Sequence, residues 1–241
     1  MVILGVDTSA VSAGAAIVKD GKLISETYIN TGLTHSQTML TLIDSALKAV
    51  DMTVEDVDAF AVSAGPGSFT GIRIGVSAIK GLCFAKNKPC FAVSTLEALA
   101  NCADIDGFVI CPVMDARCMQ VYTALFEKTD GEIKRIAEDA PKTLEELSAE
   151  LHKIGKKILL VGDGADISYK FLAEKGLDVR KFSEIFKFQH ASGVAITAYR
   201  NYNDGKSFVS ADDLQPVYLR LSQAERELNK SGVNKNDCIK Q

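Results

Sequence analysis

The chain has 241 residues, and its 27 Lys and Arg against 31 Asp and Glu give a net charge of −4 with histidine neutral and a pI near 5.5. Proteins that neutralise nucleic-acid phosphates by themselves are usually basic, so this balance argues against nucleic-acid binding by the chain alone. No hydrophobic stretch approaches the roughly 20 residues of a membrane span and no signal sequence precedes the first predicted strand, so we expect a cytoplasmic globular protein without membrane contact.

The first half of the chain predicts three strands, a helix, a strand and a helix, followed by one further strand and helix. Asp20-Gly21 is a hairpin signal between the second and third strands. A glycine-rich turn separates the fourth strand from the helix after it. The expected strands are 2–7, 12–18, 22–28, 58–63 and 90–93, and the expected helices are 34–50, 71–86 and 94–103.

The second half repeats this order from residue 107 onwards. A strand ends at Asp115, as the first strand of the chain ends at Asp7, and Asp130-Gly131 marks a second hairpin. Further strands are expected at 119–126, 132–137 and 157–161, and helices at 143–154, 166–175 and 191–203. An α/β fold with two βββαβα halves is therefore predicted, divided into 1–104, 105–222 and a charged tail, 223–241.

This duplicated order resembles the actin, Hsp70 and sugar-kinase superfamily, in which two ribonuclease-H-like domains face a nucleotide cleft. In that superfamily the hairpin after each first strand holds phosphates or their metal ion. The corresponding segments here are Asp7-Thr8-Ser9 and Asp115-Ala116-Arg117. Two interpretations stay open, because Asp7 and Asp115 could instead cap their own turns through hydrogen bonds to the backbone.

A glycine-rich loop, Gly65-Pro66-Gly67-Ser68-Phe69-Thr70-Gly71, joins the fourth strand to the next helix. Backbone amides at such a helix start can hold an anion, and Ser68 and Thr70 are available to cap the helix. The glycine spacing does not match the dinucleotide fingerprint, and no Gly-Lys-Ser or Gly-Lys-Thr sequence completes a P-loop.

Four further segments are informative when they are considered together with the glycine loop. They are VDTS (6–9), THSQ (34–37), STLEALA (94–100) and MDARCMQVYTALF (114–126). Together with the glycine loop they closely resemble the bacterial TsaB (YeaZ) family. The resemblance implies a subunit of the machinery that makes N6-threonylcarbamoyladenosine (t6A) at position 37 of tRNAs reading codons that begin with A. It also implies pairing with the catalytic paralogue TsaD and association with the ATPase TsaE.

Under this resemblance the two hairpin loops and the glycine loop form a vestigial nucleotide site, and ATP and the metal ion are expected on the partner subunits. The residues concerned are Asp7, Thr8, Ser9, Gly65, Gly67, Ser68, Thr70, Asp115 and Arg117. TsaD carries a H-x-x-x-H metal pair, which would fall here at Thr95 and Leu99. Neither side chain can replace an imidazole as a ligand, so we expect no metal and no catalytic residue in this chain.

Two predicted helices carry more hydrophobic residues than one buried face requires. One stripe of each helix is expected to face the chain's own sheet, namely Leu40, Ile43, Leu47 and Val50 in the helix at 34–50 and Ile72, Val76, Ile79 and Cys83 in the helix at 71–86. The other stripe is expected to bind TsaD, or a second copy when TsaD is absent. The expected interface is His35, Met39, Leu42, Ala46, Arg73, Ile74, Ala78, Leu82 and Ala85. Alternatively, both helices lie buried between the two halves of the chain.

Two functions from different classes therefore compete. The preferred one is a noncatalytic scaffold that stabilises TsaD, with tRNA contacted mainly through the complex. The other is an independent ATP-dependent kinase or ATPase of the same superfamily, which would need an adenosine-binding segment in the second half. The only glycine-rich segment there is Gly162-Asp163-Gly164-Ala165. A third function, that of a peptidase, has no support, because the sequence offers neither a metal-binding pair nor a nucleophile.

Overall fold

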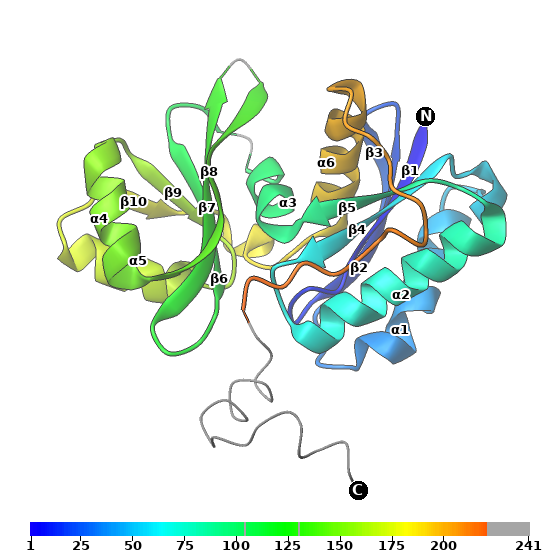
Figure 1. The fold of residues 1–241 in the computed structure, drawn as a ribbon, viewed down its shortest axis with the longest axis horizontal. Coiled ribbons are helices and arrows are strands. Elements are labelled where there is room, and N and C mark those ends of the chain that lie inside the picture. The colour runs from blue at the N-terminus through cyan, green and yellow to red at the C-terminus, as the bar shows by residue number, and fades with distance from the viewer. Residues whose placement is uncertain (104, 130, 221–241) are drawn as a thin grey trace, which may run out of the picture.

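The fold contains two five-stranded sheets (Figure 1). A computed structural model describes residues 1–103, 105–129 and 131–220 of the chain. The first sheet has the strand order β3-β2-β1-β4-β5, in which β1 is antiparallel to β2 and parallel to β4. Its strands are β1 (Val2–Asp7), β2 (Ala13–Lys19), β3 (Lys22–Ile29), β4 (Ala59–Gly65) and β5 (Cys90–Ser94).

The second sheet repeats this topology, with the order β8-β7-β6-β9-β10, β6 antiparallel to β7 and β6 parallel to β9. The predicted duplication is therefore confirmed. Strand β10 was not predicted, because only three residues pair and two of them are exposed. The strands are β6 (Val109–Asp115), β7 (Gln120–Thr129), β8 (Glu132–Thr143), β9 (Ile158–Val161) and β10 (Val179–Lys181).

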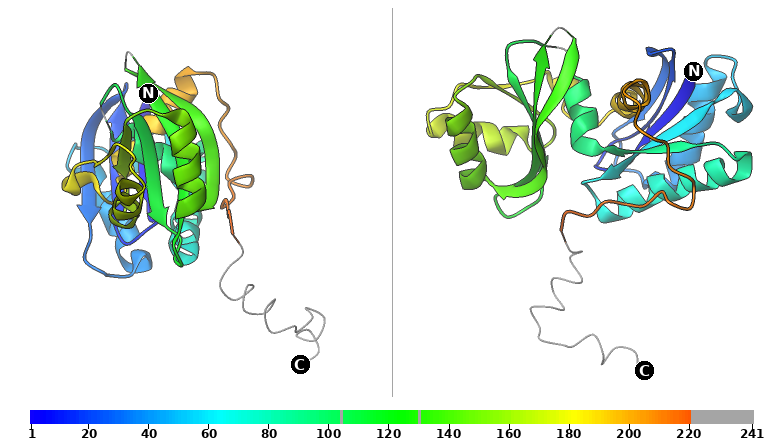
Figure 2. Two further views of the ribbon diagram at one scale, coloured as in Figure 1. Left: turned by 90° about the vertical axis from the view of Figure 1, so that its left-hand side faces the viewer. Right: turned by 45° about the horizontal axis from the view of Figure 1, so that its top comes forward.

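Helices cover both sheets in the order that the sequence predicts. Helices α1 and α2 pack on one face of the first sheet, and α4 and α5 pack on the outer face of the second (Figures 1 and 2). Among the described residues, no helix has the length and hydrophobicity to cross a membrane. The helices are α1 (His35–Lys48), α2 (Phe69–Lys86), α3 (Thr95–Asn101), α4 (Leu144–Ile154), α5 (Ala165–Glu174) and α6 (Ala191–Asn203), with short 3-10 helices η1 (Val54–Asp56) and η2 (Glu184–Phe186).

Helices α3 and α6 each pack against the sheet of the other half. Helix α3 follows the last strand of the first sheet, yet Leu96 and Leu99 pack in the core of the second sheet. Helix α6 packs in return on the first sheet, where a side chain at Gly5 would come within 2.8 Å of the Ala195 Cβ atom. The segment 191–220 therefore lies in space with the first half, although the predicted division places it in 105–222. The predicted tail, 223–241, lies outside the described residues.

The face that α1 turns to the sheet differs from the prediction. Met39, Leu42 and Ala46 were assigned to a partner, and the structure buries all three in the core shared with β1, β2 and β4. The buried face of α1 takes residues from both predicted stripes, with Ile43 and Leu47 completing it, so the assignment of Leu42 and Ala46 to a partner is wrong. A single face at positions i, i+3, i+4, i+7 and i+8 is the usual pattern of a helix on a sheet.

Helix α2 agrees better with the predicted division into stripes. Ile72, Val76, Ile79 and Cys83 are buried, whereas the other stripe stays half-buried at Ile74, Ala78 and Leu82 and exposed at Ala85. The core beneath α1 and α2 consists of residues from the first half and of the segment 209–214. The alternative that these two helices are buried between the halves is therefore wrong.

Candidate functional site

A cleft of about 470 Å³ opens between the two halves where β1, β4 and β6 end. It brings together five of the nine residues predicted for the nucleotide site. Those five are Ser9, Gly67, Ser68, Asp115 and Arg117. Asp7, Thr8 and Gly65 are buried next to the cleft, and Thr70 lines a different groove, between α1 and α2.

Asp7 is buried, and the hydrogen bonds of its carboxylate stay within its own loop and the neighbouring strand. Its Oδ1 atom accepts hydrogen bonds from the Ser9 amide and the Ser9 hydroxyl, both at 2.8 Å, and its Oδ2 atom accepts one from the Ser63 hydroxyl. Burial raises the pKa of Asp7 despite these bonds. The structure therefore matches the turn-capping interpretation of Asp7, since both carboxylate oxygens accept hydrogen bonds within the protein.

The glycine loop packs its backbone directly on the loop at residues 8–9. A Cβ atom on Gly71 would lie 2.0 Å from the Thr8 carbonyl oxygen, and one on Gly67 would lie 2.3 Å from the Ser9 carbonyl oxygen. The Ser68 amide donates to the Ser9 carbonyl at 2.6 Å, and the Thr8 hydroxyl donates to the Gly71 carbonyl at 2.7 Å. The glycines thus allow two backbone segments to meet, and the Ser68 amide and the Thr8 hydroxyl are bonded inside the protein.

In the loop after β6, the Asp115 side chain also accepts a hydrogen bond from its own loop. Asp115 Oδ1 accepts a 2.7 Å hydrogen bond from the Arg117 amide. Arg117, Cys118 and Met119 all have left-handed backbone angles, with φ of 67°, 55° and 57°. Such conformations carry strain in residues other than glycine and often occur at functional sites. The two loops therefore differ, because Asp7 is buried whereas Asp115 is exposed and lines the cleft.

Asp163, in the segment considered for adenosine binding, lies in the cleft but is not one of the nine residues predicted for the nucleotide site. Burial raises its pKa to about 6, and its Oδ1 atom has no hydrogen-bond partner within the described part of the chain. The Asp115 carboxylate nearby acts in the same direction. Only its position between Gly162 and Gly164, directly before α5, could have drawn attention to it.

We expect Asp163→Asn to stabilise the protein at neutral pH. A carboxyl whose pKa rises on folding adds stability below its unfolded pKa, near 3.8, and loses it as the pH rises through about 6. The difference corresponds to roughly 3 kcal/mol. Urea unfolding at pH 4 and pH 7 should show a variant advantage only at pH 7. Asp166→Asn should instead lower the stability at pH 7, because Lys181 and Lys187 lower the pKa of Asp166 to about 2. A gain in stability from Asp163→Asn that is equal at both pH values would contradict this account.

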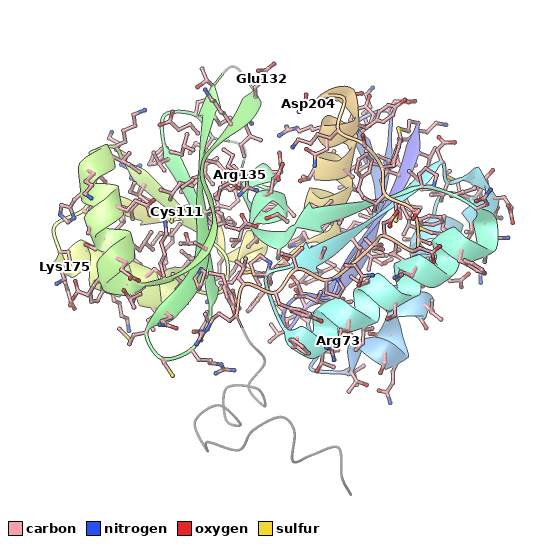
Figure 3. The ribbon with its side chains drawn as sticks, in the orientation of Figure 1. Arg73, Cys111, Glu132, Arg135, Lys175 and Asp204 are labelled. Atoms are coloured by element: carbon pink, nitrogen blue, oxygen red, sulfur yellow. The ribbon has the colours of Figure 1, made fainter. Side chains whose placement is uncertain are left out.

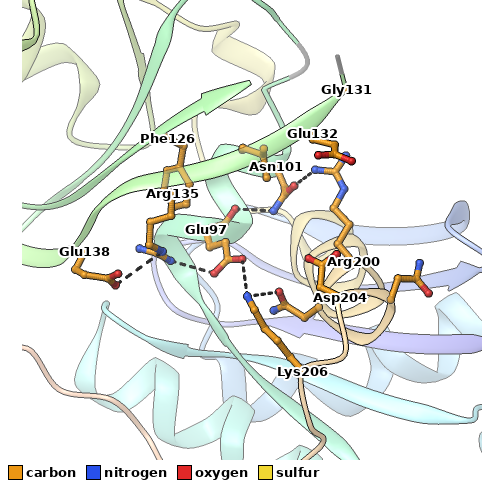
Figure 4. A pocket seen from close by; sticks show the side chains of 13 residues that line it. Glu97, Asn101, Phe126, Gly131, Glu132, Arg135, Glu138, Arg200, Asp204 and Lys206 are labelled. Carbon is orange, nitrogen blue, oxygen red and sulfur yellow. Dashed lines mark hydrogen bonds and ion pairs between the residues drawn. The ribbon is translucent and has the colours of Figure 1, made fainter. Parts of the chain in front are cut away.

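A second opening, of about 670 Å³, lies between β8 and the end of α6 (Figure 4). Figure 3 shows Glu132 and Asp204 on opposite sides of it. Arg135 pairs with Glu97 of α3 at 3.0 Å and with Asp139 of its own strand, and Lys206 approaches Glu97 to 3.9 Å. These ion pairs join β8 to α3 and to the segment after α6. The opening is therefore a place where the two halves are held together.

An apolar groove of about 490 Å³ runs between α1 and α2. Its most exposed large side chain, Leu40, is 63% exposed and was assigned to the sheet by the sequence, because it lies on the stripe that continues to Ile43. Arg73, Ile74, Ala78 and the buried Met39 line the groove, and all four are predicted partner residues. The full lining is Ser36, Met39, Leu40, Phe69, Thr70, Arg73, Ile74, Ser77 and Ala78, which we call the α1/α2 groove.

His35, at the start of α1, connects this groove to the cleft. Its Nε2 atom lies 2.7 Å from the Ala10 carbonyl oxygen, and the side chain is half-buried. His35 therefore anchors the loop after β1 more than it offers a surface to a partner. Across the described residues, no group of three or more His, Cys, Asp and Glu side chains is arranged to hold a metal ion.

Comparison with known proteins identifies the family. A sequence profile described as "TsaD: tRNA N6-adenosine threonylcarbamoyltransferase" matches residues 30–231. The chain is also 33% identical, over 93% of its length and 96% of the relative, to the tRNA threonylcarbamoyladenosine biosynthesis protein TsaB of Bacillus subtilis. The chain belongs to the TsaB (YeaZ) family. The predicted family membership is thus confirmed, and the match extends beyond the segments that carried the resemblance.

Solved structures agree with a TsaB fold. YeaZ from Pseudomonas aeruginosa superposes with a TM-score of 0.78 at 25% identity, covering 90% of this chain and 99% of that one. The ROK hexokinase of Thermus thermophilus matches with a TM-score of 0.50 at 13% identity over 85% of this chain and all of the other, which shows a shared fold alone. The predicted duplicated fold of the actin and sugar-kinase superfamily is therefore confirmed for this TsaB family member.

Proposed function

We propose that the chain is a noncatalytic subunit of the complex that forms t6A at position 37 of tRNAs reading codons that begin with A, and that it binds and stabilises the TsaD-type catalytic subunit. The name of its Bacillus subtilis relative supports the pathway. The observation that carries the proposal is a contrast within the first half. The Asp7 carboxylate and the Thr8 hydroxyl are hydrogen-bonded inside the protein, whereas the α1/α2 groove is open and apolar.

The positions of the absent histidines support a noncatalytic role. Thr95 and Leu99, where TsaD would carry its metal ligands, are buried at the start of α3 and in the core that α3 shares with the second sheet. An independent kinase or ATPase loses its main support, because Asp7 and Thr8 are already bonded within the fold. ATP and the metal ion are then bound by the TsaD-type and TsaE-type partner subunits.

The α1/α2 groove is the proposed site of subunit pairing. The TsaD profile covers the residues of both helices, so the paralogue is expected to present a comparable helix pair. Apolar helix faces of this kind pair with one another when each buries the other. Without the paralogue, a second copy would occupy the same groove as a homodimer. Because the chain has a net charge of −4, tRNA would be bound mainly by the partner subunits.

Reconstituted t6A formation tests the proposal. With the TsaD-type and TsaE-type subunits, tRNA and the activated threonylcarbamoyl donor present, omission of this chain should lower the rate at least about tenfold, because an unstabilised catalytic subunit loses its competent population. The purified chain alone should turn over no ATP above the buffer background. Full activity without the chain would refute the scaffold role, and ATP turnover by the chain alone would favour the kinase or ATPase alternative.

A further inference from the structure

The segment after α6 returns across the first half (Figures 1 and 2), and residues 217–220 line the cleft. Val209 pairs with Cys90 at the edge of the first sheet, and Leu214 is buried in the core beneath α1 and α2. The Lys80 side chain of α2 donates to the Asp212 carbonyl at 3.3 Å. Residues 216–220, which we call the strap, then pass over the glycine loop.

The strap backbone passes so close to Gly65, the first glycine of that loop, that no side chain would fit there. Gly65 has a φ of +136°, and a Cβ atom there would lie 2.1 Å from the Val217 carbonyl oxygen. The Val217 amide donates to the Ala64 carbonyl at 2.7 Å. At its far end the strap reaches the other half, where Arg220 Nη1 donates to the Ala116 carbonyl at 2.7 Å. The strap thus crosses the mouth of the cleft and contacts both halves.

Tyr218 of the strap lies against the start of α2. Its ring stacks on Phe69 with centroids 4.2 Å apart and an angle of 21°, and its hydroxyl accepts a 2.8 Å hydrogen bond from Arg73 Nε. The Arg73 guanidinium covers the Phe69 ring at 3.9 Å. Phe69 and Arg73 both line the α1/α2 groove, so Tyr218 extends the wall of that groove towards the cleft.

Arg73 places a positive charge on the wall of the α1/α2 groove. Its side chain is fixed by an aromatic ring below it and a hydroxyl beside it, and no carboxylate of the described residues pairs with it. The Nη donors of a held guanidinium bind a carboxylate well, because little further side-chain freedom is lost. Exposed Val217 and Tyr218 supply apolar area next to this charge.

We infer that the strap is part of the partner-binding face, and that the TsaD-type paralogue contacts Tyr218 and places a carboxylate on Arg73 when it occupies the α1/α2 groove. This inference rests on the proposed function. It commits to the paralogue because the groove and the strap form one continuous wall, and because the TsaD profile covers α1 and α2. The strap contacts both halves, so partner binding there would also stabilise the contact between them.

Binding of the full-length chain to the TsaD-type protein of the same genome, measured by calorimetry, tests the inference. Tyr218→Ala and Arg73→Met should each weaken binding by about tenfold, in the range of residues that dominate interfaces. Tyr169→Ala is the matched control, because Tyr169 is 38% exposed against 39% for Tyr218 and lies on α5 in the second half. Its affinity should equal that of the unmodified chain. Tyr218→Phe keeps the stacked ring and should show a smaller loss.

A second measurement needs no variant. Amide hydrogen exchange at residues 217–219 should slow by about tenfold when the paralogue binds. Unchanged exchange, together with Tyr218→Ala binding as tightly as the unmodified chain, would overturn the role of the strap and leave the proposed function standing. Absence of any binding by the unmodified chain would instead refute the proposed function, and this inference with it.

Discussion

Gly71→Ala should destabilise the protein by about 3 kcal/mol, although alanine is a better helix former than glycine. Gly71 lies in the first turn of α2, and its added Cβ would stand 2.0 Å from the Thr8 carbonyl oxygen. A backbone oxygen cannot move away as a side chain could, so the start of α2 must shift. That shift breaks the hydrogen bond from the Thr8 hydroxyl to the Gly71 carbonyl and the one from the Ser68 amide to the Ser9 carbonyl.

The same helix offers a matched control. Gly81 is exposed on α2, and no atom lies within 4 Å of the Cβ that alanine would add. Gly81→Ala should therefore stabilise the protein by about 0.5 to 1 kcal/mol, the ordinary gain in helix propensity. Chemical denaturation of both variants measures the difference. If Gly71→Ala matched Gly81→Ala, close packing would not be the reason for the glycine loop.

The contrast between Gly71 and Gly81 shows why only part of the site could be predicted from the sequence. Three glycines between a strand and a helix predicted a backbone-rich turn correctly, and Ser68 caps α2 by accepting a hydrogen bond from the Gly71 amide. The pattern does not reveal what the exposed backbone meets. In a kinase-like protein it would meet phosphate, whereas here it meets residues 8–9 and, at Gly65, the Val217 carbonyl. The last contact joins residues more than 150 positions apart, which no local pattern contains.

More of the fold than of the site could be predicted from the sequence, because the patterns that indicate the fold are local and repeated. Both hairpins follow an Asp at the end of a first strand, and the alternation of buried residues along β1 assigns Val2, Leu4 and Val6 to α1 and α2 and Ile3 to α6. Strand β10 escaped prediction because it is short and half exposed. The exchange of α3 and α6 between the halves also escaped, because the sequence specifies which residues are apolar but not which sheet they cover.

The assignment of α1 failed for a related reason. Two apolar stripes adjoin on this helix, and a shift of one residue moves the boundary between the buried and the open face. Leu40 and Leu42 show the consequence, since Leu40 is 63% exposed and Leu42 is 8% exposed. Two leucines separated by a single residue thus have different roles: Leu42 belongs to the chain's own core, and Leu40 lines the α1/α2 groove.

Replacing each leucine with aspartate should separate folding from partner binding. Leu42→Asp places an unpaired carboxylate in the core and should lower the free energy of unfolding by about 4 kcal/mol. Leu40→Asp should change stability by less than about 0.5 kcal/mol, as surface substitutions usually do. It should nevertheless weaken binding to the TsaD-type paralogue, and association with a second copy, by about a hundredfold, because the new charge is desolvated in the filled groove.

Denaturation and sedimentation of the two variants give these results side by side, and Lys48→Asp controls for added negative charge. Lys48 ends the same helix on an exposed position, outside the α1/α2 groove, so its replacement should leave both self-association and paralogue binding near the level of the unmodified chain. Normal association of folded Leu40→Asp would exclude the α1/α2 groove as the docking face. Because Leu42→Asp acts on the chain's own core, Leu40 is the one of these two leucines that can test whether this surface binds the catalytic subunit.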